Sequence, residues 1–179
     1  PAPTTTGVGL TSMALTGAGT DTDLTGSDGR YNLVLSATGS YTVTLTKNIN
    51  VTNGVSASDA TRVQQHASGA SPMTDPYMLI AADVNRDNAV TNLDATLINQ
   101  VLVGNPSALS IFNKSWRFVP KTSILVNPPW GFPEKITLSA TAGTPVTGKD
   151  FWGIKLGDVI CGFANPALKP SVVPVQWMI

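Results

Sequence analysis

The chain has 179 residues, of which 11 are Lys or Arg and 11 are Asp or Glu, so its formal net charge is zero. This length corresponds to about one domain or a few small modules, and the balanced charge excludes the basic surface typical of nucleic-acid-binding proteins. No apolar run reaches the roughly 18 residues of a membrane-spanning helix. One His and one Cys cannot build a zinc site from those two residue types. Because only one Glu is present as well, no spaced acid-base pair suggests an enzyme.

Residues 8–47 alternate apolar and polar side chains, which is typical of half-buried β-strands. Tyr31 and Leu33 alternate in one segment, and Tyr41 and Val43 do so in another. The sequence Ser-Asp-Gly at 27–29 predicts an intervening hairpin turn. Because these few strands make only a thin sheet, we expect a sheet edge that is either exposed or covered by another segment.

An internal repeat covers residues 48–104. Asp59 in the first copy corresponds to Asp94, 35 positions later. Each copy consists of a polar twelve-residue loop, a segment with helical spacing of apolar residues, and a terminating glycine at Gly69 or Gly104. The repeat therefore predicts two similar loop-helix units.

The second loop, residues 83–94, has the ligand spacing of an EF-hand-type calcium loop. Oxygen-bearing side chains stand at positions 1, 3, 5, 9 and 12, and position 7 offers its backbone carbonyl; in order, the six residues are Asp83, Asn85, Asp87, Ala89, Thr91 and Asp94. Because Ca²⁺ is a hard cation that takes several oxygen ligands, we expect it here. Position 6 is Asn88 where an EF-hand has Gly, but Asn enters the left-handed region more readily than most residues. A polar turn that only caps the next helix is the alternative.

The first loop, residues 48–59, is a weaker version of the same pattern. Its formal ligand positions are Asn48, Asn50, Thr52, Gly54 through its carbonyl, Ser56 and Asp59. Only Asp59 is a carboxylate, so the loop supplies little negative charge to neutralise an ion. Two interpretations stay open: a second calcium ion, or a loop that keeps its shape through its own hydrogen bonds.

Three helices are predicted around these loops. One apolar stripe indicates a helix that Gly104 terminates; its members are Leu93, Leu97, Ile98, Val101 and Leu102. A weaker helix at 58–68 follows the first loop, and a third at 75–82 joins the two units. Val55 and Val90 occupy equivalent positions and are expected to anchor their loops in the core.

Residues 105–163 are expected to form a second β region, followed by an extended, proline-containing tail at 164–179. The β region is rich in aromatic residues, namely Trp116, Phe118, Trp130, Phe132, Phe151 and Trp152. Their alternation with polar residues favours a small core against the repeat, and a carbohydrate-binding platform is the alternative. We expect the apolar end of the tail to pair with an open sheet edge, either of its own chain or of a neighbour in a fibre.

Residues 48–104 resemble a type I dockerin domain, through the loop 83–94, the Asn-Gly-Val-Ser of 53–56, and the His and Gly at 66 and 69. The resemblance implies that the loop positions named above ligate calcium. It also implies that positions 10 and 11 of each loop, which are 57–58 and 92–93, help to recognise a cohesin partner. These pairs are Ala-Ser and Asn-Leu, so a symmetric contact in two orientations is not expected.

Residues 22–45 resemble the last strands of a carboxypeptidase-regulatory-like, transthyretin-type β-sandwich. Such sandwiches precede dockerin-like units in large secreted or surface proteins of Bacteroidetes-type bacteria. The resemblance implies an extracellular or cell-surface location.

Together these patterns predict an α+β chain with four segments: an incomplete β-sandwich-like module at 1–47, a dockerin-like module at 48–104, a β-rich region packing on it at 105–163, and the tail at 164–179. The first hypothesis for the function is a calcium-stabilised structural or adhesive module of a bacterial surface protein, able to pair with neighbouring modules or subunits by strand addition, as in a fibre. The alternatives are a docking module for a cohesin-like partner and a carbohydrate-binding accessory module. We expect no catalytic site, one Ca²⁺ in the loop 83–94, and leave a second in the loop 48–59 open.

Overall fold

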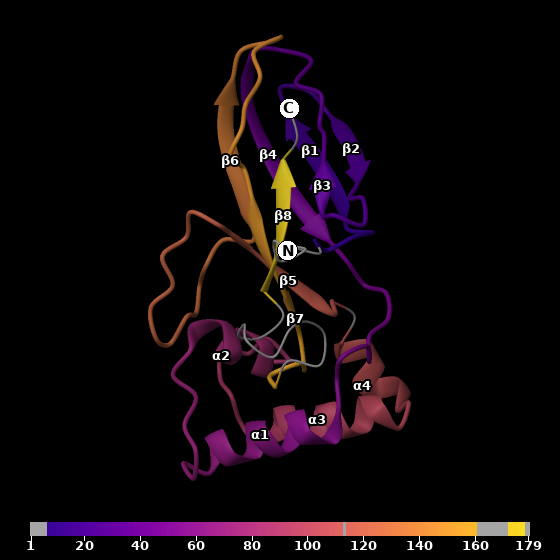
Figure 1. The fold of residues 1–179 in the computed structure, drawn as a ribbon, viewed down its shortest axis with the longest axis vertical. Coiled ribbons are helices and arrows are strands. Elements are labelled where there is room, and N and C mark those ends of the chain that lie inside the picture. The colour runs from indigo at the N-terminus through magenta and orange to yellow at the C-terminus, as the bar shows by residue number, and fades with distance from the viewer. Residues whose placement is uncertain (1–6, 113, 161–171, 178–179) are drawn as a thin grey trace, which may run out of the picture.

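The computed structural model describes residues 7–112, 114–160 and 172–177 (Figure 1). In chain order the elements are β1 (Ser12–Gly17), β2 (Asp21–Leu24), β3 (Arg30–Tyr31), β4 (Gly39–Thr46), α1 (Ala57–Ala67), α2 (Pro76–Ala82), α3 (Asn92–Leu102), α4 (Pro106–Ile111), β5 (Trp116–Pro120), β6 (Lys135–Ala140), β7 (Phe151–Lys155) and β8 (Val172–Trp177). Helices and largely antiparallel sheets occur together, which confirms the predicted α+β class.

The described strands form two four-stranded sheets, with the orders β2-β1-β4-β6 and β3-β8-β7-β5. Neighbouring strands are antiparallel except β3 and β8, which are parallel. In the first sheet Met13 lies opposite Leu45 and Leu15 opposite Val43, so apolar side chains of paired strands share one buried face. This face packs with aromatic residues of the second sheet in one core, which makes the strands a β-sandwich.

A second core lies among the helices, at the other end of the molecule from the sandwich (Figure 1). We call α1 to α4 with their connecting loops the helical module. Val63 of α1 and Ile98 of α3 are fully buried in its core, as is Leu156, which follows β7. Val55 is buried in this core, and the half-buried Val90 packs against the same core, as the repeat predicted. β5 and β7 both contribute residues to the two cores, so this pair of strands connects the two halves.

The predicted helices are confirmed, and their ends lie within a residue or two of the predicted ones. One detail of the apolar stripe was wrong, since Leu93 is 53% exposed instead of facing the core. The inward positions of the first turn of α3 are taken by Asp94 and Ala95, both fully buried. Asp94 closes the preceding loop, so Leu93 turns outward.

The hairpin predicted at 27–29 was also wrong. A turn is present, with the Gly29 N–H donating to the Gly26 carbonyl at 2.9 Å, but β2 and β3 on either side of it belong to different sheets. The two segments are joined by hydrogen bonds from side chains to the backbone, and backbone hydrogen bonds of a β-ladder do not connect them. The carboxylates of Asp21 and Asp23 in β2 accept the backbone N–H groups of residues 34 and 32, both in the stretch after β3.

The sandwich draws its strands from three separated parts of the chain. Residues 12–46, 116–155 and 172–177 all contribute, so three of the four predicted segments share one pair of sheets. β8, in the predicted tail, pairs with β7 and β3 of its own chain, which is the first of the two expected pairings. Residues 164–171 and 178–179 of that tail, and Cys161, lie outside the described residues.

Candidate calcium loops and docking face

The loop between α2 and α3 is fixed at both ends by the helices. Asp83, its first position, is the C-cap of α2, and Thr91, its ninth, is the N-cap of α3. Asp94, its twelfth, forms a capping box with Thr91, whose N–H donates to Asp94 Oδ2 at 2.9 Å. Three of the predicted ligand positions therefore owe their placement to helix termini.

Hydrogen bonds connect the first three predicted ligand residues, Asp83, Asn85 and Asp87, through their side chains and backbone N–H groups. The Asp87 N–H donates to Asp83 Oδ1 at 3.0 Å and to Asn85 Oδ1 at 3.1 Å. The Asn88 N–H donates to Asp83 Oδ2 at 3.1 Å, and the Asn85 Nδ2 donates to Asp87 Oδ2 at 2.8 Å. The structure thus gathers positions 1, 3 and 5 on one side of the loop, as their alternate spacing predicted.

Asp94 closes the loop from the other side. Its Oδ1 accepts the Val84 N–H at 3.1 Å, so position 12 contacts the residue next to position 1. The turn between them needs left-handed backbone at Arg86 and Asn88, with φ values of 63° and 68°. Asn88 therefore replaces the usual glycine of position 6 in the conformation expected for it.

Two of the loop's carboxylates are buried. Asp83 and Asp94 have no exposed surface. The pKa of Asp83 is raised to about 6, chiefly by burial and also by the negative charges of Asp94 and Asp87, while the hydrogen bonds from the Asn88 and Asp87 N–H groups oppose the rise. Burial likewise raises the pKa of Asp94. A bound cation would offset both the desolvation and the mutual repulsion.

The charge alone does not make a metal site. Within the described parts of the chain, no three His, Cys, Asp or Glu side chains are grouped closely enough to hold a metal ion. The donor set predicted for this loop contains neutral oxygens as well, from Asn85, Thr91 and the carbonyl of Ala89. Such mixed oxygen donors suit Ca²⁺, which takes carboxylate, amide and carbonyl ligands together.

The first loop is built differently. Its predicted ligands Asn48, Asn50 and Thr52 are exposed. The backbone closes on itself, since the Asn53 N–H donates to the Asn50 carbonyl and the Val55 N–H to the Thr52 carbonyl, both at 3.0 Å. The oxygens of this loop are thus drawn into local turns or turned to the surface.

The two helices that follow the loops, α1 and α3, pack against each other and leave their outer faces open. The residues at loop positions 10 and 11 are all exposed, namely Ala57, Ser58, Asn92 and Leu93. Further along both helices Thr61, Gln64, Thr96 and Asn99 are exposed as well. In Figure 1 the labelled β-strands all lie above α1 and α3.

The aromatic residues of the second β region mostly belong to the two cores. Trp116, Phe118 and Phe151 are buried in the sandwich. Trp130, Phe132 and Trp152 are partly buried against the helical module. This placement agrees with the interpretation as a core.

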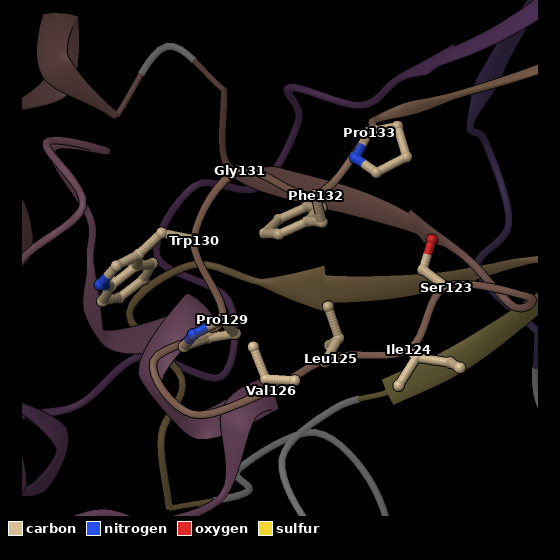
Figure 2. A pocket seen from close by; sticks show the side chains of 9 residues that line it. All are labelled: Ser123, Ile124, Leu125, Val126, Pro129, Trp130, Gly131, Phe132 and Pro133. Carbon is tan, nitrogen blue, oxygen red and sulfur yellow. The ribbon is translucent and has the colours of Figure 1, made fainter.

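The loop between β5 and β6 encloses a pocket of about 300 Å³, lined by residues 123–126 and 129–133 (Figure 2). Figure 2 shows Phe132 turned towards Leu125, with Trp130 at the far end of the loop. The Arg117 guanidinium lies 4.4 Å from the centre of the Phe132 ring, and Lys121 Nζ lies 4.9 Å from that of Trp152. Cations already occupy these two ring faces, which disfavours a sugar-stacking platform.

No described helix is long and apolar enough to cross a membrane. No curated protein and no solved structure matches the chain significantly. Residues 49–103 match the family model of the dockerin type I domain. Residues 22–45 lie outside this match, which therefore gives no support to their resemblance to carboxypeptidase-regulatory-like sandwiches. The match confirms the predicted dockerin resemblance for the segment it covers, and dockerin type I domains are calcium-binding, non-catalytic modules that dock on cohesins.

Proposed function

We propose that residues 48–104 form a calcium-organised docking module, carried on a β-sandwich, in an extracellular or cell-surface protein. The observation that carries this proposal is the open face of α1 and α3. Two helices joined in a repeat, with their inner sides in a core and their outer sides exposed beside the loops, present a surface for a partner. The dockerin match of the same residues supports this use of the face.

The ion would be held by the loop 83–94. Its ligands would be the side chains of Asp83, Asn85, Asp87, Thr91 and Asp94 and the carbonyl of Ala89. A divalent cation there neutralises carboxylates that burial and mutual repulsion otherwise destabilise. Because Asp83 ends α2 and Asp94 lies in the first turn of α3, occupancy fixes the angle between these helices.

The partner would be a cohesin-like domain. Of the four residues at the docking positions, Leu93 is the one large apolar side chain, and it is 53% exposed. An exposed leucine among small polar residues offers apolar surface whose burial by a partner would favour binding. The equivalent position of the first unit is Ser58, so the two halves of the face offer different chemistry, and docking in one orientation is expected.

A binding assay with purified type I cohesins tests the docking role. Binding should require calcium and should be lost in Leu93→Asp, because a charge would then be buried at the contact. Leu24→Asp is the matched control, since Leu24 is 55% exposed on β2 of the sandwich, away from the helices. Equal cohesin binding by Leu93→Asp and the wild type would contradict the proposal, as would cohesin binding that is unchanged when EDTA removes calcium.

A structural role of the same calcium site is the second candidate. It is favoured by the continuous path of β7 into the helical core, which makes calcium-dependent order in the helical module bear on the whole molecule. In that case calcium raises thermal stability and no cohesin binds. A fibre built by strand exchange has less support, because β8 pairs within its own chain.

A further inference from the structure

We infer that the first loop of the repeat is held by a segment of the chain itself, residues 155–160, in place of a calcium ion. Lys155 is then the fixed cation of the first loop, and the backbone of residues 159 and 160 is the partner of Asp59. The expected total of one calcium ion rests on the proposed function, which places that ion in the loop 83–94. The dockerin resemblance alone would give this loop an ion.

The two loops use their backbone N–H groups in opposite ways. In the loop 83–94 the N–H groups of positions 5 and 6 donate to the carboxylate of Asp83, and that of position 7 donates to Asp87. In the loop 48–59 the N–H groups of positions 6 and 8 donate to backbone carbonyls three residues earlier. The second loop is arranged around carboxylates, as a cation site requires, whereas the first is a pair of self-contained turns.

The one carboxylate of the first loop is fully engaged. Asp59 is 2% exposed. Its Oδ1 accepts the N–H groups of Val159 at 2.8 Å and Ile160 at 2.9 Å, and its Oδ2 accepts the Ser56 N–H at 2.9 Å and the Ser56 hydroxyl at 2.7 Å. Asp94 also receives four hydrogen bonds, but all of them come from its own loop. The two on Asp59 Oδ1 come from the segment that follows β7, so calcium could reach this oxygen only by displacing that segment.

A positive charge is already present beneath this loop. Lys155, the last residue of β7, is 1% exposed, and its Nζ donates to the carbonyl of Val51 in the loop at 2.5 Å and to that of Leu156 at 3.2 Å. Burial lowers the pKa of Lys155 to about 8, and the negative charge of the fully buried Asp158 opposes this shift and favours the charged ammonium. An ammonium that binds a carbonyl of this loop supplies positive charge there, as an ion would.

The same segment also holds α2. The Gly157 N–H donates to the Ala81 carbonyl near the C-terminal end of α2 at 2.8 Å. Residues 155–160 therefore contact both the first loop and the helix that leads into the second. This segment therefore joins the sandwich to the helical module without an ion in the first loop.

Counting the bound calcium ions tests the inference that the first loop takes none. Native mass spectrometry and calorimetric titration with Ca²⁺ up to roughly 10 mM, well above the affinities of extracellular calcium modules, should give one ion for the wild type. Asp59→Asn should still bind one and Asp83→Ala none. Two ions in the wild type would overturn the inference, as would an ion in Asp83→Ala that disappears when Asp59→Asn is added. No ion in any form would instead remove the proposed function while leaving the first loop ion-free.

The role of Lys155 needs a separate readout. Lys155→Met keeps the length of the side chain and removes the ammonium, so Tm should fall by roughly 4–10 °C, and by the same amount in Ca²⁺ and in EDTA. The wild-type stoichiometry should be retained. Lys135→Met, at an exposed position of β6, is the matched control and should change Tm little. An unchanged Tm in Lys155→Met, or a fall seen only with calcium present, would overturn the assignment.

Discussion

Replacing Asp83 by Ala is the sharpest perturbation of the second loop. Asp83 is fully buried, receives two backbone hydrogen bonds and lies near both other carboxylates of the loop. Its removal takes away position 1 of the predicted calcium site. In the wild type, calcium should raise Tm, and in Asp83→Ala this calcium-dependent rise should vanish.

The size of the expected rise follows from mass action. A calcium concentration 100-fold above Kd stabilises the folded chain by roughly 2.7 kcal/mol, which for a chain of this size corresponds to a Tm rise of roughly 5–10 °C. The structural cause is the buried carboxylate of Asp83, whose pKa is raised to about 6, chiefly by burial, and whose charge a bound cation would stabilise.

Differential scanning calorimetry in 10 mM Ca²⁺ (roughly 100-fold above a Kd of about 10⁻⁴ M) and in EDTA measures this rise. Asp28→Ala is the control, because Asp28 is an exposed aspartate in the turn after β2, away from the helical module, and its variant should keep the full calcium effect. Equal Tm values for the wild type in Ca²⁺ and EDTA would refute the reasoning. So would a calcium-dependent rise of undiminished size in Asp83→Ala.

Three further predictions concern other parts of the molecule. Asn88 has a φ of 68°, so in urea unfolding Asn88→Val should cost about 1–2 kcal/mol whereas Asn88→Gly should cost almost nothing; equal costs would contradict this. Burial and then the charge of Arg62 lower the pKa of His66, whose Nδ1 accepts the Met73 N–H. NMR titration of this single His should therefore give a value below about 6.5, and the stability it contributes should be lost as the pH falls through that value; a higher pKa would count against it. Phe118→Ala should lower the free energy of unfolding by roughly 3–5 kcal/mol without altering calcium stoichiometry, and a changed stoichiometry would show that the two cores are coupled.

The parts that sequence predicts well are held together locally. The loops and helices of the repeat depend on caps, turns and hydrogen bonds between residues a few positions apart, such as the capping boxes at Ser56 and Thr91. The left-handed Asn88 and the gathering of Asp83, Asn85 and Asp87 follow from the same local spacing. Patterns of this kind can be recognised without knowing the rest of the fold.

The sandwich could not be predicted in this way. β4 pairs with β6 and β3 with β8, partners that lie far apart along the chain. Alternation identifies a strand but carries no information about its partner. It also fails for residues 32–36, where carboxylates of β2 replace a ladder and the alternating segment forms only the short strand β3.

Lys155 was missed as a structural residue for a related reason. Lys155 stands in the otherwise apolar stretch Phe-Trp-Gly-Ile-Lys-Leu at 151–156, and a lysine in such surroundings is a signal that it has a buried partner. The sequence does not reveal that the partner is a carbonyl of a loop about 100 residues earlier. Only the folded arrangement shows that the Lys155 side chain contacts the first loop.

Anomalous X-ray scattering from crystals grown with calcium tests the central claim most directly. We expect one strong peak inside the loop 83–94, surrounded by oxygens of Asp83, Asn85, Asp87 and Asp94 at roughly 2.3–2.6 Å, and no peak in the loop 48–59. A map without a peak in the loop 83–94, recorded in saturating calcium, would contradict it.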